Sequence, residues 1–229
     1  MSTTYSMILE DVQQTGQEDC FIGGKPKLPA GSAVPKCGLC GAEQTFYFQI
    51  AFPYDHIWAG LTLAVFACTN CADGDFLIPE MLPGILPGAN IPQEYLLRYQ
   101  RNFRFEVFQT TEGQIVKDYN ERIRFRRICL GRCNGSNIGQ VGGMPTWILD
   151  DESPDVYNST TRMCFLLQVG RGAKFEIIEN SPPQRELGLS GDPEPSPFDF
   201  YQLFLGNEIY FFGTDSSALH LVYALTQVK

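Results

Sequence analysis

Alternating hydrophobic and polar positions predict strands along much of the chain. Phe46, Phe48 and Ile50 alternate with Tyr47 and Gln49, so residues 46–53 are expected to form a strand, whose side chains point to opposite faces in turn. The continuous apolar run at 61–67 has the length of a buried strand. Further strands are expected at residues 103–107, 122–126, 162–169, 208–212 and 219–225.

Helical signals are few. Residues 79–92 contain four prolines and two glycines, a composition typical of a linker. Residues 93–102 are expected to form a short helix, because Pro92 lies where the first helical turn accepts a proline. The pattern therefore predicts a mostly β fold, an α+β chain with few short helices.

A faint internal repeat divides the chain. The run IGGKP at 22–26 precedes FYFQI at 46–50, and the run VGGMP at 141–145 precedes FLLQV at 165–169. The separation from the first glycine to the glutamine is 26 residues in both copies, from Gly23 to Gln49 and from Gly142 to Gln168. A spacing shared by two matched motifs indicates two similar β-modules.

A shorter echo follows downstream, where VFACTN at 65–70 resembles VYALTQ at 222–227. The offset between the copies grows from 119 to 157 residues, so the second copy holds 38 more, expected in the acidic, Pro-rich stretch 180–200. We therefore expect an internally duplicated pair of β-modules. The first module spans residues 1–78, a linker with a short helix and a β-segment spans 79–140, and the second module spans 141–229.

Two cysteine pairs have the spacing of a metal site. Cys37-x2-Cys40 and Cys68-x2-Cys71 are separated by 27 residues, and four thiolates suffice for tetrahedral zinc. One structural Zn²⁺ per chain is expected, in a zinc-ribbon-like site; two disulfides or free thiols are the alternative. Four protein ligands leave no coordination position open, so the metal would hold structure and do no chemistry.

The repeat register predicts that the second module has no such site. In that register the four cysteines match the residues Val156, Ser159, Leu225 and Val228. None of these side chains is a metal-binding thiol. Apolar packing is therefore expected to replace the metal in the second module.

The remaining cysteines give weaker signals. Cys129-x3-Cys133 could be half of a second metal site, but no matching pair is evident. Both residues are expected to be ordinary buried or partly buried thiols, and Cys164 is expected to lie in the core.

Nucleophilic catalysis is not expected. Cys20 would need a nearby base, and the chain has only two histidines, His56 and His220. His56 is too isolated to be assigned a catalytic role, and His220 falls in an apolar run that favours a core position. No catalytic residue is therefore predicted.

The charge distribution favours a basic protein partner. The net charge is −9, with −7 in residues 1–97, +5 in 98–132 and −7 in 133–229. Acidic ends disfavour binding to nucleic acid and suit a basic protein, although solubility alone also explains them. Two segments are candidate partner contacts, one with Trp147, Asp150, Asp151, Glu152 and Asp155, the other with Glu186, Asp192 and Glu194.

An arginine row lies between the two acidic ends. Residues 122–127 alternate arginines with apolar side chains and end in a pair of arginines. The row is either an anion-binding stripe or, more commonly, a sheet face whose charges are solvated or paired locally.

The compartment follows from what the sequence lacks. No apolar run reaches the length of a membrane span, and the first residues do not have the pattern of a signal peptide. Reduced thiols then suggest a cytoplasmic location with no membrane partner.

The Gly-Gly-x-Pro runs, the Cys-x2-Cys pairs and the Phe-x-x-Gln strands resemble the YwqG-like family of uncharacterised bacterial proteins. A weaker similarity points to the zinc-containing programmed-cell-death-protein-two family, which acts as a chaperone for a ribosomal protein. The resemblance covers about residues 20–80 and 140–225. It implies a non-catalytic, zinc-stabilised protein that binds another protein, most specifically an immunity protein that neutralises a toxin. The alternatives are a chaperone for a basic client and an enzyme with a site between the modules.

Overall fold

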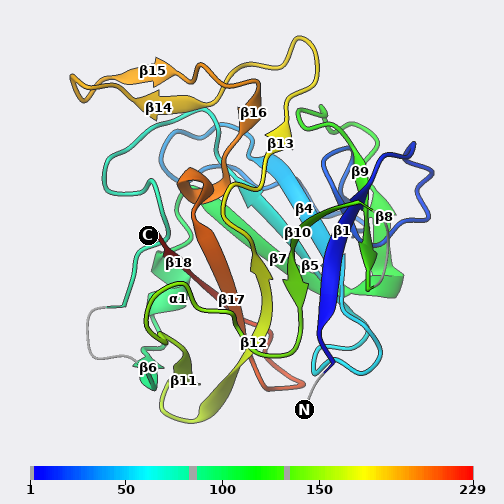
Figure 1. The fold of residues 1–229 in the computed structure, drawn as a ribbon, viewed down its shortest axis with the longest axis vertical. Coiled ribbons are helices and arrows are strands. Elements are labelled where there is room, and N and C mark those ends of the chain that lie inside the picture. Colours follow the sequence, from blue (N-terminus) through cyan, green and yellow to red (C-terminus); the bar gives the residue numbers. More distant parts are fainter. Residues whose placement is uncertain (1–2, 83–86, 132–134, 229) are drawn as a thin grey trace.

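The computed structural model describes residues 3–82, 87–131 and 135–228, and it shows a mostly β chain (Figure 1). One large sheet has the strand order β18-β17-β12-β10-β1-β9-β2-β4-β5-β7. Its strands are β1 (Tyr5–Glu10), β2 (Phe21–Ile22), β4 (Thr45–Ala51), β5 (Leu61–Ala67), β7 (Phe103–Gln109), β9 (Arg126–Leu130), β10 (Ser136–Val141), β12 (Thr161–Val169), β17 (Glu208–Thr214) and β18 (Val222–Gln227). The expectation of a mostly β fold with a four-cysteine cluster is confirmed.

Short strand pairs and helical turns surround the sheet. The pairs are β3 (Lys27–Pro29) with β8 (Gly113–Ile115), β6 (Ala89–Ile91) with β11 (Pro154–Tyr157), β13 (Phe175–Glu176) with β16 (Phe200–Tyr201), and β14 (Arg185–Leu187) with β15 (Pro193–Pro195). The helical elements are α1 (Tyr95–Arg98), η1 (Thr110–Glu112) and η2 (Leu203–Gly206). The β14–β15 hairpin projects from the body at the upper left of Figure 1.

Two sets of four strands share one hydrogen-bond register. The first strand set is β2-β4-β5-β7, and the second strand set is β10-β12-β17-β18. Pairings in the first set recur 119 residues later in the second. The pair Phe21–Gln49 corresponds to Gln140–Gln168, and the bulge between Phe46 and Phe48 corresponds to the bulge between Phe165 and Leu167.

The two Gly-Gly turns match as well. The N–H of Gly23 donates to the carbonyl of Tyr47 at 3.0 Å, and that of Gly142 donates to Leu166 at 2.8 Å. Their φ angles are 58° and 70°, in the left-handed region that favours glycine. A Cβ on Gly23 would also lie 2.4 Å from the carbonyl oxygen of Arg124, so both conformation and space require glycine.

β1 and β9 join the two strand sets into one sheet. β1 pairs with β10 of the second set, and β9 pairs with β2 of the first. β1 and β9 also pair with each other, in a register that places Ile8 opposite Cys129. Parts of the segment 79–140 thus belong to the sheet itself, because β7 and β9 lie wholly within it.

The register corrects one step of the repeat alignment. The sequence echo matched 65–70 with 222–227, but these belong to β5 and β18, whose places in the two sets differ. β5 corresponds to β17, and β7 corresponds to β18. Cys68 therefore matches Thr214, not Leu225. The duplication itself stays a prediction.

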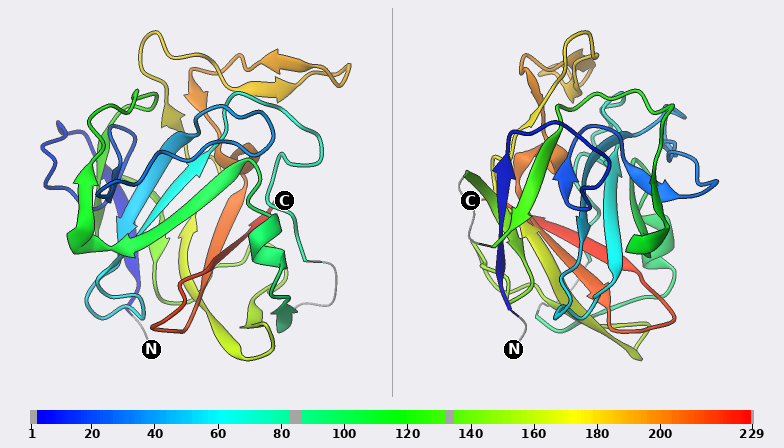
Figure 2. Two further views of the ribbon diagram at one scale, coloured as in Figure 1. Left: turned by 180° about the vertical axis from the view of Figure 1, so that it is seen from behind. Right: turned by 90° about the vertical axis from the view of Figure 1, so that its right-hand side faces the viewer.

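The core explains why β5 is apolar on both faces. Phe48 of β4 and Phe105 of β7 contact Phe211 of β17, with ring centroids 5.9 and 5.6 Å apart, so the two strand sets pack against each other. A second cluster that includes Phe66 and Tyr119 covers the other face of the first set. Figure 2 shows β4, β5 and β7 side by side in the view from behind. A strand buried on both faces needs a continuous hydrophobic run.

Three local expectations are wrong. Residues 122–126 do not form a strand, because β9 begins at Arg126 and Ile123 forms only an isolated bridge with Ile177. The helix expected at 93–102 is reduced to the four residues of α1. His220 lies before β18, which begins at Val222, rather than inside a strand.

Candidate metal centre

Four thiols meet at one end of the first strand set. Cys37 and Cys40 lie in the loop before β4, and Cys68 and Cys71 follow β5 directly. The sulfur atoms lie within 4.8 Å of one another, and the three closest pairs are 3.5 to 3.7 Å apart. Thiolates about 2.3 Å from a central zinc are about 3.8 Å apart in a regular tetrahedron. A disulfide sulfur pair is only about 2.0 Å apart, so these separations fit a shared metal and not two disulfides.

Backbone N–H groups point at the first sulfur of each pair. Leu39 donates to Cys37 Sγ at 3.4 Å, and Asn70 donates to Cys68 Sγ at 3.3 Å. The first turn is closed by the N–H of Gly41, which donates to the carbonyl of Cys37 at 2.9 Å. Hydrogen bonds of this kind favour the thiolate form that a metal requires.

A segment after α1 links the two cysteine turns. The carbonyl of Arg101 accepts from Gly38 N–H at 2.7 Å, and the carbonyl of Asn102 accepts from Cys68 N–H at 2.7 Å. A Cβ on Gly38 would lie 2.9 Å from that Arg101 oxygen, which explains a glycine between the first two cysteines. No sequence pattern indicates this contact, because the acceptors are backbone carbonyls that any residue provides.

The four thiols of the cluster differ in burial. Cys37 and Cys68 are buried, Cys71 is half-buried and Cys40 is exposed. Burial raises the pKa of the Cys68 thiol to about 11, and it also raises the pKa of Cys71. A bound cation would offset this cost of ionisation. The Arg122 guanidinium donates to the hydroxyl of Thr69, the residue after Cys68, at 3.3 Å.

The first acidic segment is held against the second strand set. The Trp147 ring packs on Tyr210, with centroids 4.3 Å apart, as expected of a packed tryptophan. The Gln227 amide accepts from Leu149 N–H and donates to the carbonyl of Asp150, at 3.1 and 2.8 Å. Asp151 and Asp155 in the same segment are exposed, and Glu152 is half-buried with a contact to the Gln227 amide.

The second acidic segment lies elsewhere, beside the metal centre. Glu186 and Glu194 face each other across the β14–β15 hairpin, and Asp192 lies in its turn. The N–H of Arg185 donates to the carbonyl of Thr69 at 2.9 Å, which fixes the hairpin to the second cysteine turn. In Figure 1 this hairpin is at the top and β11 is at the bottom, so the structure does not bring the two acidic segments together.

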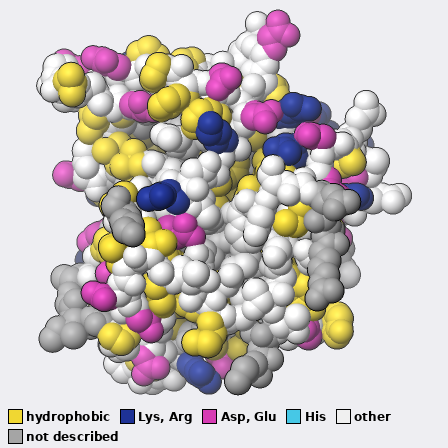
Figure 3. Space-filling model, in the orientation of Figure 1, with side chains coloured by type: hydrophobic (Ala, Val, Ile, Leu, Met, Phe, Trp, Pro, Cys, Tyr) yellow, Lys and Arg dark blue, Asp and Glu magenta, His cyan; other side chains and the backbone are white. Residues whose placement is uncertain are grey.

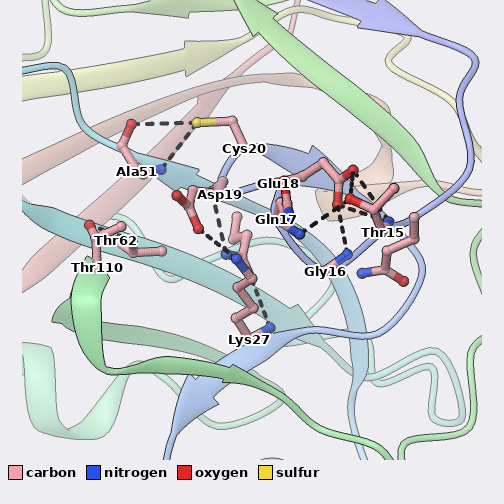
Figure 4. Close-up of polar contacts among 12 residues, drawn as sticks. Thr15, Gly16, Gln17, Glu18, Asp19, Cys20, Lys27, Ala51, Thr62 and Thr110 are labelled. Carbon is pink, nitrogen blue, oxygen red and sulfur yellow. Dashed lines mark hydrogen bonds and ion pairs between the residues drawn. The ribbon is translucent and has the colours of Figure 1, made fainter.

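Cys20 is held against the backbone of β4. Its sulfur accepts from the N–H of Ala51 at 3.3 Å and lies 3.5 Å from the carbonyl of Ala51 (Figure 4). Burial raises the pKa of Cys20 to about 12, which keeps the thiol protonated and poorly nucleophilic. The neighbouring Lys27 pairs with Asp19 at 2.7 Å.

His56 and the remaining cysteines also have structural surroundings. His56 Nδ1 accepts from Trp58 N–H at 3.0 Å, the ring is hydrogen-bonded to the Leu166 backbone, and burial lowers the pKa of His56 to about 4. Cys164 is half-buried, and burial raises its pKa. Cys129 is disulfide-bonded, so the expectation of an ordinary thiol is wrong there, and Cys133 lies outside the described residues.

Most of the arginine row is paired locally. Arg124 contacts Glu176 at 3.1 Å, Arg126 contacts Asp11 at 3.0 Å, and Arg127 contacts Glu10 at 2.6 Å. Figure 3 shows Lys and Arg side chains interleaved with Asp and Glu at the upper right, near β9 and β13. The row is therefore a paired face rather than an anion-binding stripe, and Arg122 differs from the rest of the row because its guanidinium donates to the hydroxyls of Thr45 and Thr69.

Comparison with known proteins adds no assignment. No protein-family model matches the chain. A search of curated proteins also gives no match. Within the described ranges, none of the helices has the length and apolar character that a membrane crossing requires.

Proposed function

We propose that this protein binds a basic protein partner and that a structural zinc ion holds the binding surface in place. The observation that carries the proposal is the backbone bond from Arg185 to Thr69, which joins the acidic hairpin to the residue after Cys68. Four thiolates fill a tetrahedral site and leave no position for a substrate. Zinc binding adds to folding free energy, on the order of 10–16 kcal/mol in small zinc peptides.

The specific partner follows from charge and from the family resemblance. The net charge of −9 and the acidic hairpin support a basic partner. An immunity protein that neutralises a basic toxin is the form that we propose first, and a chaperone for a basic client such as a ribosomal protein is the second. An enzyme with a site between the strand sets is less supported, since Cys20 and Cys164 have raised pKa values and His56 is engaged by backbone groups.

The location is a separate part of the proposal. Thiols reduced for metal binding favour the cytoplasm, which we propose, whereas the Cys129 disulfide favours an oxidising compartment. Fractionation of the native host tests this point. Recovery of the protein outside the cytoplasmic fraction would refute it.

Elemental analysis tests the metal. Protein purified without added metal should contain close to one zinc per chain, and the Cys37→Ser variant should contain much less. The matched Cys164→Ser variant should keep its zinc, because that thiol is outside the cluster. No zinc in the unaltered protein, or another metal in stoichiometric amount, would overturn the zinc assignment.

Affinity capture from the native host tests the partner. The tagged full-length protein should retain a basic protein, and the complex should dissociate as salt is raised, because charge complementarity is screened. A toxin recovered with it supports the immunity role, and a ribosomal precursor supports the chaperone role. Retention of acidic proteins only, or turnover of a small molecule by the purified protein, would count against protein binding as the function.

A further inference from the structure

A cavity of about 220 Å³ lies between the second cysteine turn and the β14–β15 hairpin. Its apolar walls come from segments far apart in the chain, with Phe76 and Leu77 on one side and Leu187 and Leu205 on the other. Cys68 and Cys71 also line it, so the metal centre forms part of its wall. The cavity can therefore keep this shape only while the cysteine turn is ordered.

Leu205 reaches this cavity through an unusual backbone conformation. Phe204 and Leu205 in η2 both have positive φ, at 47° and 62°, which residues with a Cβ adopt rarely. Phe204 is buried, with its ring 5.1 Å from that of Phe103, while Leu205 remains 46% exposed. The turn thus anchors one apolar side chain in the core and presents the next one at the cavity.

The charges around the cavity are mostly negative. Asp73 and Glu186 line it, and Asp75, Asp192 and Glu194 lie on the same turn and hairpin. The basic side chain in the lining is Arg185, whose guanidinium donates to the carbonyl of Pro193 at 2.7 Å. Four thiolates around a divalent metal would add two further negative charges. A ligand for this cavity must therefore be cationic as well as apolar.

We infer that the cavity binds a basic peptide segment of the partner, with one aliphatic side chain inserted against Leu205 and Leu187. Lysine or arginine residues on either side of that anchor would then meet Asp73 and Glu186 at the rim. The inference rests on the proposed function, because it names the surface that the basic partner uses. It also predicts that binding depends on the metal, since Cys68 and Cys71 form part of the wall.

Selection of random nonapeptides displayed on phage tests the inference on the full-length, zinc-loaded protein. Enriched peptides should contain an aliphatic residue flanked by lysine or arginine. Their dissociation constants, measured by fluorescence polarisation, should rise at least tenfold in Leu205→Gly and in Glu186→Gln, and binding should be lost after chelation of zinc. Asp118→Asn, which changes an exposed acid outside the cavity lining, is the matched control and should bind as the unaltered protein does.

The Leu205→Gly variant separates binding from folding. Glycine accepts the positive φ at position 205, so the melting temperature should be unchanged or higher while peptide affinity falls. The inference would be overturned by enriched peptides without basic residues or by the absence of any enriched sequence. It would also be overturned if Leu205→Gly and Glu186→Gln bound the peptides as tightly as the unaltered protein does. Should the captured partner depend on Asp151 and not on Leu205, the inference fails while the proposed function stands.

Discussion

The matching ends of the two strand sets are closed in different ways. β5 ends at Ala67, and the N–H of the next residue, Cys68, donates to the carbonyl of Asn102. The turn that begins there contributes two thiols to the candidate metal centre. β17 ends at Thr214, whose N–H donates to Leu221 in the matching place, at 3.1 Å. The Thr214 hydroxyl bonds the backbone of its own loop, and its carbonyl accepts from the Trp58 indole at 3.0 Å. The same register thus supports closure by a metal or by hydrogen bonds.

The loops that precede β4 and β12 also differ between the two sets. In the first set the turn of Cys37 and Cys40 is joined to Cys68 by the sulfur cluster and by backbone hydrogen bonds through residues 101 and 102, with an isolated bridge between the flanks of that turn. In the second set Val156 lies in β11, which pairs with β12 and with β6. Backbone pairing secures that loop, so no metal is needed. A metal held by the four thiols would take the place of strand pairing in the first loop, whose flanks form an isolated bridge.

The largest effect should come from breaking the metal-closed end. Cys68→Ser removes one of four ligands, and we expect the melting temperature to fall by more than about 10 °C, since about 1 kcal/mol corresponds to roughly 2–4 °C in a chain of this size. Cys164→Ser should cost much less. Thermal unfolding with and without a zinc chelator gives the comparison, and the chelator should have little further effect on Cys68→Ser. A similar loss in both variants would show that the metal centre is not what closes this end.

The sequence predicted the strands well where the pattern was local. The run at 61–67 matches β5 to the residue, because a strand buried on both faces is mostly apolar. Thr62 is its buried polar residue, and its hydroxyl bonds that of Thr110 at 2.9 Å. The arginine row also alternates with period two, yet Ile123 and Phe125 pack against different clusters, so alternation there did not mean a strand.

Metal ligands and cavity differ in how far the sequence could reveal them. The four cysteines were predictable, because the Cys-x2-Cys spacing is fixed by the chemistry of a shared metal. The cavity was not, since its lining comes from segments around Cys71, Asn102, Leu187 and Leu205 that only the tertiary fold brings together. The repeat alignment failed at β18 for a related reason: a resemblance over six residues does not specify a register.

A second, smaller effect on stability should appear at acidic pH, at the end of the second strand set that Thr214 closes. The loop that carries Trp58 also carries His56, whose pKa is lowered to about 4 by burial. A histidine with a lowered pKa stabilises the fold at pH values above its ordinary pKa of about 6.5. This stability is lost as the pH falls toward 4. The shift corresponds to about 3 kcal/mol. The free energy of unfolding should therefore fall between pH 6.5 and 5 in the unaltered protein and less in His56→Gln.

Zinc content must be followed at each pH in that experiment, because protons also compete for thiolates. The comparison is valid over the range in which both proteins keep their metal. Asp55, the charged neighbour of His56, raises its pKa and is present in both proteins. Identical pH dependence in the two proteins would mean that His56 does not limit the acid stability of this end.

The smallest effect should come from the glutamines that hold the two Gly-Gly loops. Gln49 Oε1 accepts from Lys27 N–H at 3.0 Å, and Gln168 Oε1 accepts from Thr146 N–H at 2.8 Å, in matching positions. Replacing either by leucine leaves a backbone N–H without its acceptor, at a cost of about 1–3 kcal/mol. The loss of stability in Gln168→Leu should lie at the upper end of this range, because the Gln168 amide also donates to the buried carboxylate of Glu208.

Urea unfolding of the two leucine variants, with zinc bound and again after chelation, measures how alike the strand sets are in energy. Comparable losses would mean that the matched register carries matched stability, whatever closes each end. A loss in Gln49→Leu that vanishes when zinc is bound would mean instead that the metal alone holds the first loop. The two sets would then share their strand pairing but not its contribution to stability. Hydrogen bonds would close the end of the second set only.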